Sequence, residues 1–109
     1  QGTVSIAAGM AMAGLLPIVY SIVNFIAFRA LEQIRNDVAL QNLNVKFIAT
    51  GVNNYFEFLG PSHCCNEDDK KIIQLINIKV YDPYDKKSAD FDGLIREWIT
   101  DTKAGYIRV

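Results

Sequence analysis

The segment FLGPSHCCNEDD, residues 58–69, holds most of the side chains in this chain that could perform chemistry. It contains the only histidine, His63, and both cysteines, Cys64 and Cys65, with a run of acidic residues after them. Side chains of these types can bind a metal ion, supply a nucleophilic thiol, or offer an imidazole to a ligand bound elsewhere. Which of these chemistries applies depends on the fold that presents the segment.

A metal site would draw its ligands from His63, Cys64, Cys65, Glu67, Asp68 and Asp69. Adjacent residues rarely direct their side chains to one ion, and no second cluster completes the coordination shell, so we predict no metal site. The acidic residues are more simply the solvated first turn of a helix, where they complement the helix dipole.

A nucleophilic cysteine would need a base close to it in space and a lowered pKa. The position of His63 beside Cys64 in the sequence is evidence of neither, and we expect Cys64 and Cys65 to be small apolar fillers. Two adjacent cysteines cannot build a disulfide framework, which predicts free thiols in a reducing, cytoplasmic compartment.

The composition is that of one small domain. The chain has 109 residues, 50% of them hydrophobic and 21% charged, with a formal net charge of −1. The length suits one modest core, and the absence of a basic tract argues against nucleic acid as a partner. Residues 1–28 carry no charge, but Gly9, Gly14, Pro17 and Asn24 interrupt them, so a buried helix and strand are favoured over a membrane span.

Helices and strands alternate along the first half of the chain. A small apolar helix is predicted over 3–13. The β-branched run over 16–23 predicts a strand covered on both faces. Asn24 can then cap one long helix over 25–42, and 45–50 is the next predicted strand.

The second half continues the alternation. Asn66 can cap a helix whose first turn is 67–69, and 78–81 is a predicted strand. The segment 82–102 turns into a helix, and 104–109 is a final strand.

Strands that alternate with helices through short links predict an α/β fold, a three-layer sandwich with a mostly parallel sheet. Four strands that begin with an unpaired helix would make an incomplete sheet, so we expect 1–109 to be a domain fragment that lacks its N-terminal part. Ligands of such sheets bind outside the carboxyl ends of the strands, which makes 23–25 and the long loop 51–65 the candidate site loops.

Phe25 and Phe28 are one helical turn apart, so both rings lie on nearly the same side of the predicted helix. Packing in the core is the simpler interpretation. The two rings also stand at the start of a helix at the carboxyl edge of the sheet, where aromatic side chains can offer a flat wall to a heterocycle.

Four blocks of the sequence together resemble a known family. They are AAGMAMAGLLPIV (7–19), NFIAFRALEQIRNDVALQNLNVKFIATG (24–51), GPSH (60–63) and IKVYDPYD (78–85). In this order they resemble the pyrimidine-binding domain of the thiamine-diphosphate enzymes of the transketolase group, most closely its transketolase and deoxyxylulose-phosphate synthase branches. The β subunits of 2-oxo acid dehydrogenases share the fold.

The resemblance implies the thiamine-diphosphate-binding fold and a cofactor site. Phe25 and Phe28, with Leu31 one turn later where a tyrosine is usual, would pack against the aminopyrimidine ring of thiamine diphosphate. The glutamate that assists tautomerisation of this ring would directly precede Gln1 and is absent from the chain. The diphosphate and its Mg²⁺ would be held by a partner domain with a GDG motif, which does not occur in this chain.

The activity implied by the resemblance is transfer of a two-carbon ketol unit between sugar-type substrates. His63 of GPSH would face the substrate channel, where it would hydrogen bond to substrate oxygens or move a proton. Leu59 stands where an acidic residue usually recognises an acceptor hydroxyl, so an unusual substrate is expected. The expected assembly is a homodimer with active sites between the pyrimidine domain and a diphosphate-binding domain or subunit, and the chain alone is expected to be inactive.

Two alternatives remain open. The chain could be a non-catalytic α/β dimerisation module, such as a degenerate homologue. It could also be the β-subunit type half of a 2-oxo acid dehydrogenase, with a 2-oxo acid as its substrate.

Overall fold

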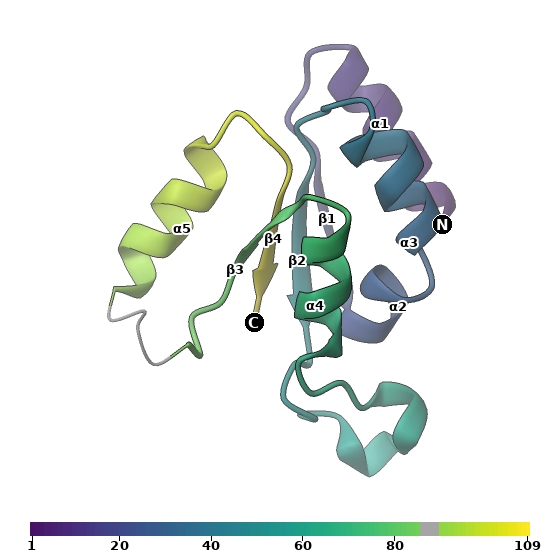
Figure 1. Cartoon of the computed structure of the whole chain (residues 1–109), viewed down its shortest axis with the longest axis vertical. Coiled ribbons are helices and arrows are strands. Elements are labelled where there is room, and N and C mark those ends of the chain that lie inside the picture. Colours follow the sequence, from purple (N-terminus) through teal and green to yellow (C-terminus); the bar gives the residue numbers. More distant parts are fainter. Residues whose placement is uncertain (86–89) are drawn as a thin grey trace.

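Four parallel strands form one sheet in the order β1-β2-β4-β3, so the strands follow a different order in space than along the chain (Figure 1). The computed structural model describes residues 1–85 and 90–109. The strands are β1 (Ile18–Ile22), β2 (Lys46–Thr50), β3 (Lys79–Tyr81) and β4 (Gly105–Arg108). The predicted α/β fold with a mostly parallel sheet is confirmed.

Helices cover both faces of this sheet, which gives three layers (Figure 1). One face carries α1 (Gly2–Met12), α2 (Val23–Ala27), α3 (Leu31–Gln33), the π-helix η1 (Ile34–Ala39) and α4 (Asp68–Leu75). The other face carries α5 (Phe91–Thr100). Two short 3₁₀ helices, η2 (Glu57–Leu59) and η3 (Pro61–His63), lie in the loop between β2 and α4.

The handedness of the connections explains which face each helix covers. The steps from β1 to β2 and from β2 to β3 run in one direction across the sheet, and their helices lie on one face. The step from β3 back to β4 runs in the opposite direction, so a right-handed crossover places α5 on the opposite face. The loops after β2 and β3 therefore leave the sheet toward opposite faces, which opens a crevice at the carboxyl end of β4.

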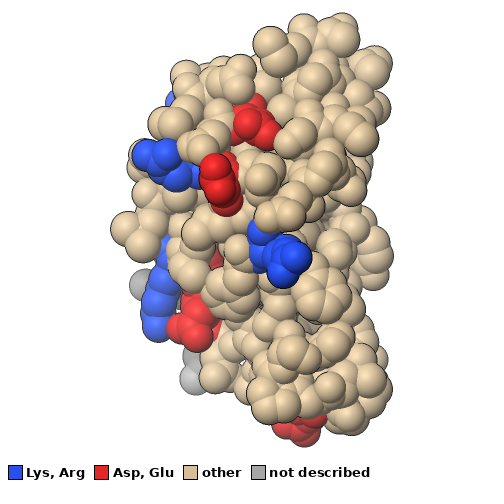
Figure 2. All heavy atoms as spheres, turned by 90° about the vertical axis from the view of Figure 1, so that its right-hand side faces the viewer, with Lys and Arg blue, Asp and Glu red and all other residues tan. Residues whose placement is uncertain are grey.

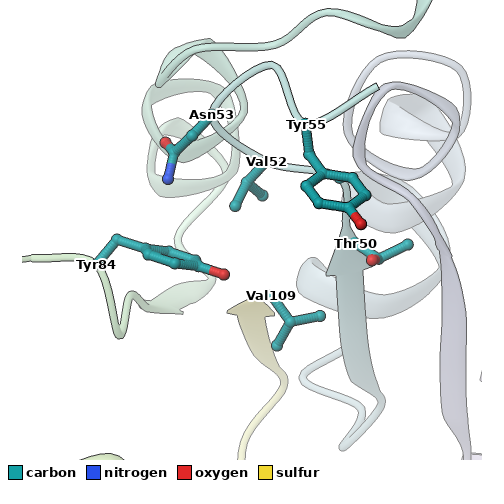
Figure 3. Close-up of a pocket in the computed structure, with 7 residues that line it drawn as sticks. Thr50, Val52, Asn53, Tyr55, Tyr84 and Val109 are labelled. Carbon is teal, nitrogen blue, oxygen red and sulfur yellow. The ribbon is translucent and has the colours of Figure 1, made fainter. Parts of the chain in front are cut away.

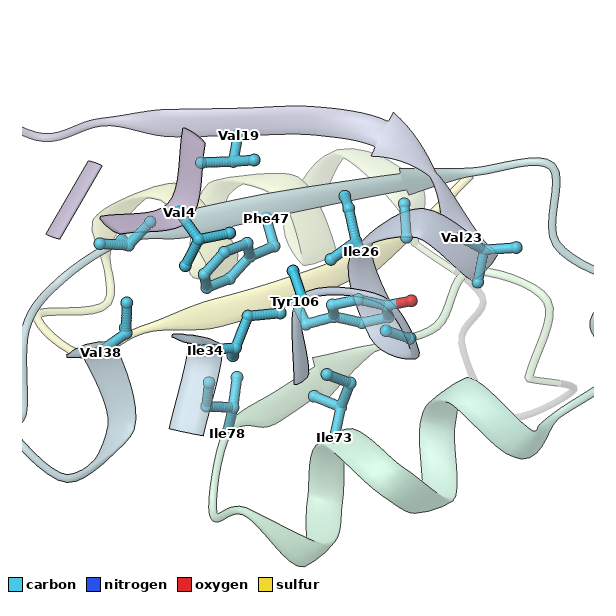
Figure 4. Packing of buried hydrophobic residues seen from close by; sticks show 14 of the residues in the cluster. Val4, Val19, Val23, Ile26, Ile34, Val38, Phe47, Ile73, Ile78 and Tyr106 are labelled. Carbon is cyan, nitrogen blue, oxygen red and sulfur yellow. The ribbon is translucent and has the colours of Figure 1, made fainter. Parts of the chain in front are cut away.

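The larger core lies between the sheet and the helices α1 to α4 (Figure 4). It includes the buried side chains of Val4, Val19, Ile26, Ile34, Phe47, Ile73 and Tyr106. A smaller core beneath α5 is built on Tyr81, Trp98 and Ile107. Within the described residues, every helix falls short of the length and hydropathy that a membrane crossing requires.

β1 is an edge strand with one uncovered face, and the prediction of a strand covered on both faces is wrong. Val19 is buried in the larger core, whereas Ile18 and Tyr20 point to the other face and are 51% and 67% exposed. α5 packs against β4 and β3 through the smaller core, to which β1 contributes no residue among those described.

The single helix predicted over 25–42 is broken soon after it begins. α2 ends at Ala27, and the carbonyl of Asn24 accepts hydrogen bonds from the backbone N–H groups of both Phe28 and Arg29, which widens the turn. The helix resumes as α3 and continues as the π-helix η1. Asn24 does not cap α2 either, because α2 begins at Val23 and its N-cap residue is Ile22.

Replacing Gly105 with alanine should destabilise the fold, because the new Cβ would lie 2.9 Å from Trp98 Cδ1 and 3.2 Å from Tyr81 Cε2. The carbonyl of Gly105 also accepts the indole N–H of Trp98 at 3.0 Å, so this strand and α5 cannot easily separate. We expect a loss of about 1–3 kcal/mol in the free energy of unfolding, measured by urea denaturation.

Gly9→Ala is the matched control for this substitution, because outside the adjacent residues and backbone of α1 nothing lies within 4 Å of the Cβ position at Gly9. It should leave the stability unchanged or raise it by up to about 1 kcal/mol, since alanine favours a helix over glycine. Equal losses in the two variants would contradict the packing argument.

Candidate functional site

The long loop between β2 and α4 is shaped by residues that tolerate left-handed backbone conformations. Gly51 and Gly60 have φ values of 79° and 96°, and Asn53 and Asn54 have φ values of 55° and 60°. Glycine and asparagine are the residues that adopt such angles most readily. At Gly51 a side chain is also excluded, because a Cβ there would overlap the ring of Phe56.

This loop brings His63 against the start of α2. The imidazole of His63 meets the ring of Phe25 edge to face, with 5.4 Å between the ring centroids and an interplanar angle of 76°. Ser62 Oγ lies 3.0 Å from His63 Nδ1, within hydrogen-bond distance. Two residues predicted for the site, from segments far apart in the sequence, are therefore in contact.

Phe25 also lines a cavity of about 210 Å³ between the start of α1, β1 and α2. The other lining residues are Gln1, Thr3, Val4, Val19, Tyr20, Ser21, Ile26, Arg29 and Ala30. Complete sites for small molecules usually measure roughly 300–1,000 Å³, so this cavity suits one ring of a ligand better than a whole ligand. Its combination of an aromatic wall and polar groups is suited to a heterocycle.

A larger pocket of about 390 Å³ lies at the carboxyl edge of the sheet (Figure 3). It is lined by Thr50, Gly51, Val52, Asn53, Tyr55, Tyr84 and Val109. Figure 3 shows the rings of Tyr55 and Tyr84 on opposite sides, with Val52 and Val109 between them. The pocket occupies the crevice between the loops that leave β2 and β3 toward opposite faces, where α/β sheets commonly bind ligands.

A buried ion-pair network lies beside this pocket. Arg108 donates from Nε to Asp69 at 3.0 Å and from Nη1 to Asp82 at 2.8 Å. Its Nη2 donates to the carbonyl of Asn66 at 2.6 Å, and the hydroxyl of Tyr106 donates to Asp69 at 2.9 Å. Arg108 and Asp69 have almost no exposed surface, so each charge depends on the other for compensation.

Residues 1–108 of the chain match the model of the family described as "Transketolase, pyrimidine binding domain". The chain belongs to this family. The resemblance seen in the four sequence blocks is thereby confirmed.

This transketolase pyrimidine-binding domain is similar to parts of two longer proteins. One is the 6-deoxy-6-sulfo-D-fructose transketolase subunit SqwH of Clostridium sp. (strain MSTE9), 30% identical over 82 residues that make up 75% of this chain and 26% of the relative. The other is a solved structure, "Split gene transketolase, inactive beta4 tetramer", with a TM-score of 0.79 and 30% identity over 98% of this chain and 33% of that chain. The chain thus spans about a quarter to a third of the relatives it matches.

The three residues predicted to contact the cofactor differ in their relation to the smaller cavity. Phe25 lines the smaller cavity, but Phe28 and Leu31 are not among its lining residues. Phe28 follows the last residue of α2 and is 40% exposed, and Leu31, at the start of α3, is half-buried. Phe28 keeps helical backbone geometry, because its N–H donates to the carbonyl of Asn24, and the break between α2 and α3 lies between it and Leu31.

The acidic segment of this pyrimidine-binding domain differs from its prediction. Asp69 is fully buried and paired with Arg108, so the expectation of a solvated acidic turn is wrong for this residue. Asn66 does not cap α4 with its side chain, because the N-cap residue is Glu67 and the carbonyl of Asn66 is bound by Arg108.

Cys65 lacks the features of a catalytic thiol. Cys64 and Cys65 are free, and Cys65 is buried in the larger core, as an apolar filler would be. Burial raises the pKa of Cys65 to about 11, which disfavours the thiolate. Across residues 1–85 and 90–109, no group of three or more His, Cys, Asp or Glu side chains could hold a metal ion.

Sequence reasoning missed Tyr55, Tyr84 and Arg108 as parts of the site. Arg108 carried a usable signal, because an arginine within the otherwise apolar strand GYIRV must be paired if the strand is central. The only signal from the two tyrosines was that each follows a predicted strand. Nothing in the neighbouring sequence indicates that they line the same pocket.

Asp82→Asn should destabilise the protein in a pH-dependent way. Burial raises the pKa of Asp82, but hydrogen bonds from Arg108 and Lys70 outweigh it and hold the pKa below the ordinary value of 3.8. A carboxylate with a lowered pKa in the folded state adds stability above the unfolded pKa and loses it as the pH falls through the folded pKa. We expect the variant to lose about 3 kcal/mol in the free energy of unfolding at pH 7.

Urea denaturation at pH 7 and at steps below pH 4 measures this effect. The difference between wild type and Asp82→Asn should shrink as the pH falls below 3.8, the ordinary value for this carboxyl. Asp68→Asn is the control, because Asp68 is exposed and its ion pair with Lys71 is long, at 3.6 Å. This variant should change the free energy of unfolding by less than about 1 kcal/mol. A constant difference across the pH range would contradict the ion-pair account.

Proposed function

We propose that this domain binds the aminopyrimidine ring of thiamine diphosphate in a transketolase-like enzyme that transfers a two-carbon ketol unit between sugar-type substrates. The observation that carries the proposal is the contact between Phe25 and His63 beside a ring-sized cavity. This contact unites the expected cofactor wall with the expected substrate-channel residue. When bound, thiamine diphosphate supplies the electron sink for this chemistry, and the protein supplies position and electrostatics.

The ring of Phe25 is the main protein surface proposed for the aminopyrimidine. It is 45% exposed and lines the smaller cavity, so one face of the ring is available to a ligand. Phe28 and Leu31 would extend this wall outside the cavity and contribute less. The diphosphate and its Mg²⁺ are assigned to a partner domain or subunit, because the chain has no GDG motif.

His63 is proposed to act on the substrate at the same place. Its imidazole is half-buried, so it remains accessible to a ligand while its position is restricted. When Ser62 Oγ donates to Nδ1, the ring proton resides on Nε2, which then can donate a hydrogen bond to a substrate oxygen. The same nitrogen can also transfer a proton.

The larger pocket is proposed to receive the acceptor substrate. Thr50, Tyr55 and Tyr84 supply hydroxyl groups and Asn53 an amide, which are groups suited to the hydroxyls of a sugar chain. Leu59, half exposed, stands where the family usually has an acid. Similarity to a subunit named for a sulfonated sugar supports a modified sugar as the substrate class.

The proposed assembly is a homodimer joined to a diphosphate-binding domain or subunit in the cytoplasm. α1 contains no charged residue, and Figure 2 shows a wide uncharged area on this side of the molecule. Ile6 and Met12 of α1 are each 67% exposed, as is Tyr20 of β1. Apolar surface of this extent is typical of an interface, and the names of both relatives refer to multi-subunit proteins.

Phe25→Ala should weaken binding of thiamine diphosphate by about 1–3 kcal/mol, because it removes a desolvated aromatic contact. Isothermal titration calorimetry on the assembled protein, with its diphosphate-binding partner, measures this loss. Phe91→Ala is the matched control, because Phe91 is similarly exposed, at 49%, but lies on α5 at the opposite face. A folded dimer that binds no cofactor even as wild type would indicate a non-catalytic dimerisation module instead.

His63→Ala should reduce turnover by about 10²–10⁴-fold, the usual contribution of a group that transfers a proton in the transition state. The affinity for thiamine diphosphate should change by less than about threefold, because His63 is assigned to the substrate and not to the cofactor. Steady-state kinetics and calorimetry on the same preparation measure both. Equal losses of turnover and affinity would mean that the histidine is structural.

A further inference from the structure

One hydrogen bond joins the direct neighbours of Phe25 and His63. The side-chain amide of Asn24 donates from Nδ2 to the carbonyl of Cys64 at 2.9 Å, across 40 positions of the sequence. Asn24 immediately precedes Phe25, and Cys64 immediately follows His63. The bond therefore connects the start of α2 to the end of η3 at the point where the two rings meet.

The loop beyond this bond is already held to other elements. The carbonyl of Asn66 accepts from Arg108 of β4, and the side chain of Asn66 accepts from Asn54 at 2.7 Å. Cys65 is buried, with its Sγ 3.5 Å from Asp69 of α4. These contacts fix the chain after His63 to the body of the domain, and the bond from Asn24 adds the connection toward α2.

The bond to Cys64 leaves the other polar atom of the Asn24 amide unpaired. Its Oδ1 is buried and has no hydrogen-bond partner among the described residues. Buried polar atoms are nearly always paired, so an unpaired one calls for an explanation. Asn24 does not cap α2, which leaves the bond to Cys64 as the interaction that accounts for an asparagine at this position.

We propose that Asn24 is a positioning residue that holds the imidazole of His63 edge to face against Phe25 through the carbonyl of Cys64. The inference rests on the proposed function only in assigning a catalytic consequence to this geometry. The placement itself is a property of the folded domain and can be measured without cofactor or substrate.

The direct test is the ¹H NMR signal of His63 in an Asn24→Leu variant, which removes the amide donor without adding charge and nearly preserves the side-chain shape. The signal is assigned by its loss in His63→Gln. The variant Phe25→Leu gives the chemical shift of the His63 signal when the neighbouring aromatic ring is absent. We expect the chemical shift of His63 in Asn24→Leu to move at least halfway from its wild-type value toward its value in Phe25→Leu. A signal that stays at the wild-type position would overturn the proposal.

Asn44→Leu is the matched control. Asn44 also donates from Nδ2 to a distant carbonyl, that of Asp101, at 3.3 Å, and its Oδ1 is likewise buried without a partner among the described residues. It precedes β2 and therefore lies at the opposite edge of the sheet. The His63 signal should be unchanged in this variant, and equal shifts in both variants would show a general loss of packing and reject the role of Asn24.

The catalytic consequence is tested by a double-mutant cycle on the assembled enzyme. Asn24→Leu should lower turnover about tenfold, and Asn24→Leu combined with His63→Ala should be no slower than His63→Ala alone, because the effect passes through His63. Independent, additive losses would reject the catalytic consequence. If His63→Ala leaves turnover intact, the proposed function fails, and the NMR signal still decides whether Asn24 positions the ring.

Discussion

The buried guanidinium of Arg108 is the constraint on which the carboxyl edge of the sheet depends. A charge removed from water is costly unless its hydrogen bonds are satisfied, and Asp69, Asp82 and the carbonyl of Asn66 satisfy them here. These three partners belong to α4, to the turn after β3 and to the loop after β2. One side chain from β4, a central strand, therefore fixes the relative positions of the elements that surround the larger pocket.

The loop after β2 is anchored at both ends and exposed in its middle. Val52 near its start is buried in the larger core, Tyr55 and Phe58 are 72% and 74% exposed, and near its end Cys65 is buried and Asn66 is bound by Arg108. His63 lies close to the second anchored end, so its imidazole is placed by the rigid body of the domain. Accurate placement of a reactive group requires this kind of support from surrounding contacts.

Much of the fold could be predicted from the sequence because its signals are local. The strand over 45–50 and the apolar helix near the start are recognisable from neighbouring residues alone, and the alternation of elements predicted the parallel sheet. The uncovered face of β1 and the break after Ala27 depend on which helix packs on which face, and local patterns do not contain that information. The burial of Asp69 was missed for the same reason, because its partner Arg108 is 39 positions away.

β4 is synthesised after the other three strands, although it lies between β2 and β3 in the sheet. Until its residues leave the ribosome, β3 cannot pair with its neighbour and β2 is unpaired along one edge. Pairing between strands far apart in sequence is slow, and unpaired apolar edges attract other chains. The nascent domain therefore passes through a period of vulnerability to aggregation, which ends when Gly105–Arg108 enters the sheet.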